Sequence, residues 1–251
     1  MDGPSIIALS GQMALKQHLD TIANNIANMN ASGYRGDRLL FQSFISKLAV
    51  PGRQVAFVQD RATYVDAAQG SIESTGNPLD IAINGEGFIA VQRPGNEGRG
   101  FSRDGRLKIA ADRTLVDNAG RPVLDEGNAK ILIPERASKL EIRADGTIIA
   151  TIDRRPQQVG RIALSRSTDP HAVRKAGDGL YDIPAAQLVP VDPLARSTRI
   201  AQGSLERSNI QAVAEISNLA ELQRSYERMQ KIVSDDDSRL HKMIDALSRS
   251  N

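Results

Sequence analysis

The sequence predicts an α+β protein, in which long N- and C-terminal helices pair as a coiled coil and flank a central antiparallel β-rich domain. Residues 76–200 hold 13 of the 20 glycines and 9 of the 11 prolines, a density typical of short strands joined by turns. Residues 204–251 contain neither glycine nor proline. At both ends, apolar residues recur at alternating spacings of three and four, the pattern of a heptad seam.

The first element is a helix expected within residues 1–33. The apolar stripe that defines it comprises Leu19, Ile22, Ile26 and Met29. Gly33 follows Ser32 where a helix-ending glycine is expected, so the helix ends there. A helix with so narrow a stripe cannot bury it alone, and the C-terminal helix is the expected partner.

Residues 34–74 are expected to connect the helix to the β-rich domain. The apolar run over residues 39–48 is compatible with a continued helix. Pro51-Gly52 then breaks the pattern, and residues 55–65 have an extended character.

The central β-domain is expected over residues 75–202. Leu79, Ile81 and Ile83 alternate with polar or small residues, and the turn sequence Asn-Gly-Glu-Gly at residues 84–87 leads into a second apolar run. Asn-Gly between two such runs predicts a hairpin. Further strands are expected near residues 107–109, 115–116, 131–133, 140–142, 147–152, 161–164 and 181–183. Asp-Gly pairs at residues 104–105, 145–146 and 178–179 are expected turns.

The last element is one long helix expected over residues 203–251. Its heptad seam includes Leu219, Leu222, Tyr226, Met229, Val233 and Leu240. The spacing favours a coiled-coil face. A long amphipathic helix lying on a globular core is the alternative that periodicity leaves open.

Composition excludes several functions. The chain has no cysteine, and its 32 basic and 30 acidic residues nearly cancel, so neither thiolate chemistry nor nucleic-acid binding is expected. No apolar run is long enough to span a membrane, and no signal-peptide pattern is present. His18, His171 and His241 lack metal-ligand spacing, so no metal, cofactor or catalytic site is predicted. A carboxylate pair brought together by folding would leave a hydrolase open.

Several stretches in order along the chain resemble the axial proteins of the bacterial flagellum, the rod and hook family. IANNIANMNASGYR at residues 22–35 is similar to the family's N-terminal signature, and GSIESTGNPLDIAINGEGF at residues 70–88 to its entry into the β-domain. SRDG at residues 102–105 and LVDNAGRPVL at residues 115–124 continue the likeness. GSLERSNI at residues 203–210, followed by Glu215 and RSYE at residues 224–227, completes it.

The resemblance implies a structural subunit of the basal-body rod and no enzyme. The single middle domain and the length of 251 residues favour a rod protein, proximal or distal, over the longer hook protein. Expected partners are other rod proteins and the flagellar export apparatus, while contact with copies of its own chain and with peptidoglycan stays open. The location implied is the rod in the periplasmic space, reached from the cytoplasm by type III export without a cleaved signal peptide. A stand-alone coiled-coil binding module is the competing class.

The asparagines of the N-terminal helix are unusual because asparagine is a poor helix former. Asn24 and Asn28 fall opposite the apolar stripe, with Asn25 at its flank. We interpret these three, with Gly33 and Tyr34, as contacts to neighbouring subunits. A solvated polar face is the alternative, although glutamate and lysine would serve that purpose better.

Overall fold

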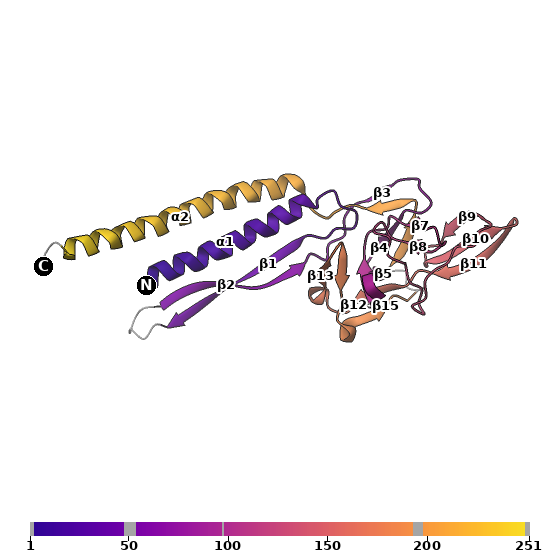
Figure 1. The fold of residues 1–251 in the computed structure, drawn as a ribbon, viewed down its shortest axis with the longest axis horizontal. Helices are drawn as coiled ribbons and strands as arrows, with labels where there is room; N and C mark the ends of the chain where they lie inside the picture. The colour runs from indigo at the N-terminus through magenta and orange to yellow at the C-terminus, as the bar shows by residue number, and fades with distance from the viewer. Residues whose placement is uncertain (1–2, 48–53, 97, 193–197, 249–251) are drawn as a thin grey trace. The chain divides into compact units, whose positions relative to one another are not determined.

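The computed structural model describes residues 3–47, 54–96, 98–192 and 198–248. They divide into two compact units (Figure 1). The helical unit comprises Met1–Ala27, Asp37–Tyr64 and Gln211–Asn251, and the β unit comprises Asn28–Gly36 and Val65–Ile210.

In the helical unit, α1 (Gly3–Ala27) and α2 (Ala212–Ser248) lie side by side. A two-stranded sheet of β1 (Asp37–Lys47) and β2 (Gln54–Val65) follows α1, with β1 in contact with the helix (Figure 1). The two terminal helices contact each other, and the segments between them in the chain form antiparallel β-sheets. These observations confirm the predicted α+β class.

The apolar run that was compatible with a continued helix forms a strand where the structure describes it. Residues 39–47 belong to β1, paired with β2, and residue 48 lies outside the described residues. An apolar run of this length has no decisive periodicity, and a neighbouring extended segment provides a partner for its backbone.

Both helices are shorter than expected at the ends that join the β unit. Residues 28–33 form turns, with the Ala31 N–H donating to the Asn28 carbonyl, because asparagine side chains compete with the helical backbone. At the other end, β17 (Ser204–Glu206) precedes α2 and pairs with β3 (Ile72–Ser74). The Asn209 amide then accepts from the Gly36 N–H and donates to the Ala68 carbonyl.

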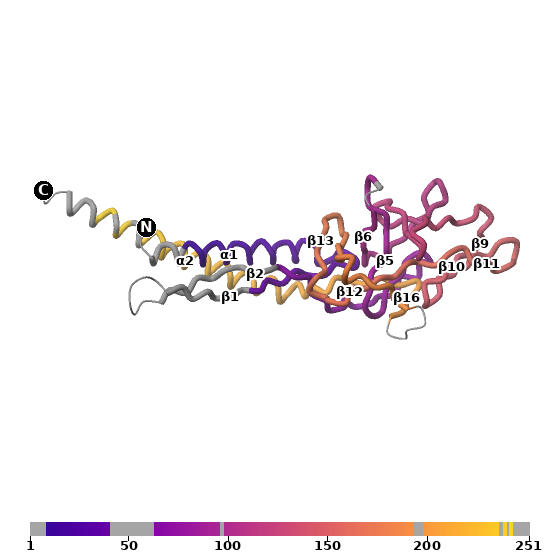
Figure 2. Tube along the Cα trace, turned by 90° about the horizontal axis from the view of Figure 1, so that it is seen from below, coloured from indigo at the N-terminus to yellow at the C-terminus, as the bar shows by residue number. Residues whose placement is uncertain are grey.

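The β unit contains short antiparallel sheets. Its largest has the order β13-β14-β6-β5-β12-β15, a second has the order β11-β10-β9, and β16-β4, β17-β3 and β7-β8 are pairs (Figures 1 and 2). The remaining strands are β4 (Ile81–Asn84), β5 (Phe88–Gln92), β6 (Arg99–Ser102), β7 (Lys108–Ile109), β8 (Leu115–Val116), β9 (Ala137–Ile142), β10 (Thr147–Ile152), β11 (Arg155–Arg161), β12 (Leu164–Ser167), β13 (Arg174–Gly177), β14 (Leu180–Asp182), β15 (Leu188–Pro190) and β16 (Arg199–Gln202). Three single turns of 3-10 helix, Pro94–Asn96, Pro170–Ala172 and Ala185–Gln187, lie in its connections.

The turn at residues 84–87 does not make the predicted hairpin. β4 pairs with β16, whereas β5 pairs with β6 and β12. Gly85 and Gly87 have φ of 110° and 135°, conformations that L side chains rarely adopt, and they redirect the chain into another sheet. In contrast, Asp178 and Gly179, with φ of 49° and 73°, join β13 to β14 as a tight turn of the expected kind.

Two clusters of buried apolar side chains form the core of the β unit. The larger is rich in isoleucine and gathers residues from β4, β5, β8, β9, β10 and β16, including Ile81, Ile89, Ile148 and Ile200. The smaller contains Phe88, Phe101 and Tyr181. The core is therefore built from strands that are distant in sequence.

Candidate functional site: the helix pair and a buried arginine cluster

Several residues of the predicted seam are buried or half-buried in the helical unit. Ile22 is buried, and Leu19 and Ile26 are half-buried. On α2 the half-buried seam residues are Leu219, Leu222, Tyr226, Met229 and Val233.

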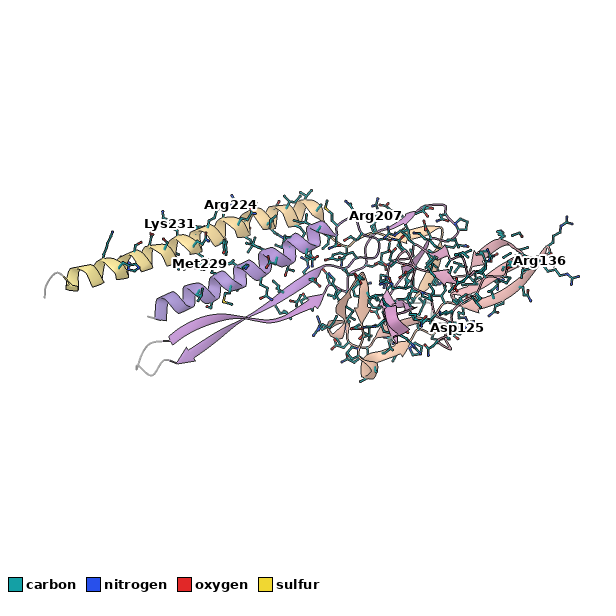
Figure 3. The ribbon with its side chains drawn as sticks, viewed as in Figure 1. Asp125, Arg136, Arg207, Arg224, Met229 and Lys231 are labelled. Carbon is teal, nitrogen blue, oxygen red and sulfur yellow. The ribbon has the colours of Figure 1, made fainter. Side chains whose placement is uncertain are left out.

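Contacts across the helix pair are seen at two of these α2 residues. The Gln12 amide donates to the Tyr226 hydroxyl at 3.4 Å. A Cβ added at Gly11 would meet the Met229 methyl at 3.2 Å, so glycine allows the close approach. Figure 3 shows Met229 on α2, with Arg224 and Lys231 on the side facing away from α1.

Of the two remaining seam residues, only Met29 can be placed. Met29 lies beyond the end of α1, in the turn that follows it, and is half-buried there. The side chain of Leu240 lies outside the described residues. The part of the seam that the structure describes on α1 thus ends before Met29.

A polar group interrupts the seam near the start of α2. Glu215 is buried and accepts from the Arg38 guanidinium at 3.1 Å. Burial lowers the pKa of His18, and the charge of Glu215 opposes this effect. Arg38 is at the beginning of β1, so this ion pair connects β1 to α2.

Asn25 has an intramolecular role that the sequence did not suggest. Its side chain is 1% exposed, its amide donates to the Asp37 carbonyl at 3.0 Å, and its Oδ1 accepts from the Asp37 N–H at 3.0 Å. The amide thus holds the first residue of β1 against α1. A side chain buried this way cannot face a neighbouring subunit in this conformation, whereas Asn24 is exposed and Asn28 is half-buried.

Gly33 and Tyr34 also contact residues of their own chain. Gly33 has φ of 67°, and an added Cβ would lie 2.3 Å from the Arg103 carbonyl oxygen. Its N–H donates to the Glu206 carbonyl, and its own carbonyl accepts from the Tyr181 hydroxyl. The Tyr34 ring carries the Lys175 ammonium 3.9 Å from its centroid.

A buried arginine cluster lies beside Gly33, formed by Arg35, Arg103, Glu206, Phe88 and Tyr181. The Arg103 Nη1 donates to the Glu206 carboxylate at 2.6 Å, and both side chains are fully buried. The Arg35 Nη2 lies 4.0 Å from the other oxygen of the same carboxylate. Both guanidiniums lie 5.5 Å from the centroid of the Phe88 ring, within the range of cation–π attraction.

The backbone completes this cluster. Arg103 also donates to the carbonyls of Ile83 and Gly85, at 3.1 and 2.5 Å. The Gly70 N–H donates to Glu206 at 3.3 Å. Burial raises the pKa of Tyr181 to about 12, so its hydroxyl stays protonated and donates.

Sequence reasoning missed this cluster although all its residues except Tyr181 were within the motifs singled out. Arg35 ends the N-terminal motif, Phe88 ends the second, Arg103 lies in SRDG, and Glu206 lies in GSLERSNI. The signal available was an arginine or glutamate inside three of these motifs and the aromatic residue that ends the other. Four motifs scattered over most of the chain therefore meet at one point in space.

The surface of the helical unit carries exposed apolar side chains. Leu9 and Met13 on α1 are 49% and 66% exposed, and Val213 on α2 is 81% exposed. Leu9, Met13, Asp20 and Asn24 share one side of α1, since spacings of four and seven residues return to the same face. This α1 stripe is distinct from the seam and from the side where Asn25 meets β1.

No chemistry-bearing site competes with these features. Among the residues described, no group of histidine, aspartate or glutamate side chains is arranged to hold a metal ion. Nor does any described helix have a stretch long and apolar enough to cross a bilayer. The features described above are a packed helix pair, a buried ion-pair cluster and exposed apolar side chains.

Comparison with known proteins identifies the family. Three family profiles match: "Flagella basal body rod protein" over residues 7–35, "Flagellar hook protein FlgE/F/G D1 domain" over residues 82–150, and "Flagellar basal body rod FlgEFG protein C-terminal" over residues 201–246. The flagellar basal-body rod protein FlgF of Caulobacter vibrioides is 36% identical, with all of both chains aligned. FlgF of Mesorhizobium japonicum is 37% identical over 88% of each chain. A FlgG from Buchnera aphidicola subsp. Schizaphis graminum is 29% identical over 96% of this chain and 98% of its own.

The chain belongs to the flagellar basal-body rod protein family and is FlgF-like. It is a structural protein of the rod and not an enzyme. The predicted family is confirmed, as is the prediction of a rod protein over a hook protein. Membership in this family implies assembly with other rod proteins.

Proposed function

We propose that the subunit joins the rod through its helical unit, with the α1 stripe of Leu9, Met13, Asp20 and Asn24 facing a neighbouring subunit. The observation that carries the proposal is the exposure of Leu9 and Met13, one turn apart. Burying a large apolar side chain contributes about 1.5–3 kcal/mol, so these two residues favour an apolar partner over water. The partner is the helical unit of another rod subunit.

The outer side of α2 is less suited to this role in its middle part. Glu221, Arg224, Glu227, Arg228 and Lys231 cover it with charge. Charged side chains are depleted at the centres of interfaces because their desolvation is costly. The α1 stripe is therefore the preferred apolar contact.

Asn24 extends the stripe toward the end of α1. An amide both donates and accepts, so it can fix the register between two helices, as one buried asparagine does in a coiled coil. Our hypothesis of asparagine contacts between subunits therefore centres on Asn24. Asn25 supports it indirectly, by holding β1 against the same helix.

Repeated contacts of this kind between subunits related by a rotation and a rise extend along an axis. The role that follows is to transmit torque by stiffness, within a rod reached by flagellar type III export and located in the periplasm. Before assembly the helical unit is only marginally ordered, because Ile22 is the one buried apolar side chain among those described in it. During assembly the subunit would meet neighbouring copies of this chain, other rod proteins and peptidoglycan.

The test is incorporation into basal bodies of cells that produce full-length variants. Met13→Glu places a charge on the α1 stripe and is expected to abolish incorporation and motility. Leu132→Glu makes the same change at a side chain of the β unit that is 58% exposed, and is expected to leave both intact. Normal rods with Met13→Glu would contradict the proposal.

A further inference from the structure

The Arg35 guanidinium is buried without a hydrogen bond to any of the residues described. Its side chain is 8% exposed, and its Nε is fully enclosed and has no partner. The nearest carboxylate oxygen, on Glu206, is 4.0 Å away, beyond hydrogen-bond distance. Buried charged groups are normally hydrogen-bonded, since an unsatisfied one costs more than the 1–3 kcal/mol or so of a neutral group.

Glu206 cannot serve both arginines equally. Its carboxylate already accepts from Arg103 at 2.6 Å and from the Gly70 N–H at 3.3 Å. Two guanidiniums therefore share one carboxylate, which leaves one positive charge in the cluster. The pKa of Arg103 is lowered to about 10, first by burial and then by the charge of Arg35, consistent with this excess.

Arg35 also lines a cavity of about 60 Å³. Phe88, Gly87 and Ser167 also line it, as does Arg166, whose side chain is 45% exposed. This volume exceeds the 10–15 Å³ or so that one water needs, so a carboxylate group fits. Among the residues described, Glu86 is the only acid that lines it. Its side chain is 77% exposed and lies 4.0 Å from Arg166, so it neutralises little of the buried charge of Arg35.

We propose that this cavity is a binding site for a carboxylate, held by the guanidiniums of Arg35 and Arg166. Arginine presents parallel N–H donors that match the two oxygens of a carboxylate. The carboxylate is either a free small molecule or the side chain of an aspartate or glutamate from another polypeptide. The site belongs to the β unit and does not depend on the α1 stripe.

The direct test follows the arginine Nε–Hε signals of the full-length chain by NMR during titration with sodium acetate. Sodium chloride at equal ionic strength is the reference. Arg35→Lys keeps the charge but removes the Nε, and so identifies the Arg35 signal. A saturable shift of that signal with acetate, absent with chloride, is expected.

Arg166→Gln and Arg136→Gln are the matched pair of variants. Both arginines are in the β unit with a weak ion pair, at 4.0 and 3.9 Å, and Figure 3 shows Arg136 extending away from the strands. Loss of one charge-assisted hydrogen bond should weaken acetate binding about tenfold in Arg166→Gln, with no change in Arg136→Gln. Absence of a saturable shift, or equal weakening by the two substitutions, would overturn the proposal.

Incorporation into basal bodies separates the two sources of the carboxylate. If acetate binds and Arg166→Gln alone lowers incorporation, the natural ligand is a side chain of a neighbouring subunit. If acetate binds and both variants assemble normally, the ligand is a free carboxylate. Both results support the site, and each assigns it to one source.

Discussion

The β unit and the helical unit bury different kinds of residue. The β unit has two clusters of buried apolar side chains, with residues such as Ile89 and Ile148 almost inaccessible. Among the side chains described in the helical unit, the buried ones are Ile22, Asn25 and Glu215, one apolar and two polar. Fixing the backbone of one residue costs about 1–2 kcal/mol in conformational entropy, and burying one isoleucine side chain contributes about 1.5–3 kcal/mol. One buried isoleucine therefore offsets the ordering of only one or two residues.

We expect the two units to be stabilised in different ways. The β unit has an apolar core of its own. The helical unit leaves Leu9, Met13 and Val213 in solvent, and we propose that other subunits cover them. Substitutions in each unit test whether the β unit and the helical unit are stabilised separately.

Removing the buried carboxylate is expected to destabilise the β unit most. Glu206→Leu leaves the guanidiniums of Arg103 and Arg35 without a counter-charge, which should lower the free energy of unfolding by about 3–5 kcal/mol. Denaturant unfolding followed by near-ultraviolet circular dichroism measures it. Glu73→Leu is the control, because Glu73 and Arg207 form an exposed pair at 2.8 Å that contributes about 0–1 kcal/mol. Equal effects would mean that burial of the ion pair does not matter.

Truncation of one buried isoleucine in each unit compares their cores. Ile148→Ala in β10 should lower the free energy of unfolding of the β unit by about 2–5 kcal/mol. Ile22→Ala in α1 should weaken only the helical signal at 222 nm and leave the unfolding midpoint of the β unit unchanged. If both substitutions lower one common midpoint, the two units unfold together and the comparison fails.

Neighbouring asparagines on α1 should respond in opposite directions. Asn25→Ala removes two hydrogen bonds to the Asp37 backbone and should destabilise the helical unit by about 1–3 kcal/mol. Asn24→Ala, at an exposed position, should increase helix content slightly because alanine is the better helix former. Amide exchange at Asp37 and helix content report the two effects, and protection of Asp37 unchanged by Asn25→Ala would contradict the assigned role.

The smallest expected effect is a pH dependence of the helical unit. Burial holds the pKa of His18 below its ordinary value of 6.5, so folding favours the neutral imidazole. The associated stability is present above pH 6.5 and declines as the pH falls below it. Helix content should therefore decrease slightly on acidification, and His18→Gln should reduce this slope. An identical slope in the variant would assign the effect to other groups.

Periodicity was sufficient to predict both helices, since Leu19, Ile22 and Ile26 and their α2 counterparts repeat at helical spacing. The Asp178–Gly179 turn was also predictable, because local residues determine its conformation. Pairings between segments that are distant in sequence could not be predicted in this way. Ile83 pairs with Ile200, and Arg103 contacts Glu206, and neither local pattern indicates the partner. The pairing of the two helices through the whole predicted seam, and the contacts of Asn24 with neighbouring subunits, remain predictions.

We expect the purified subunit to have a stable β unit and a marginal helical unit. Native-state hydrogen exchange of the isolated full-length chain tests it most directly. We expect slow exchange in β5 and β10, and exchange in α1 and α2 that is faster by several orders of magnitude. Equal protection of the helices and the β core in the isolated subunit would contradict the claim.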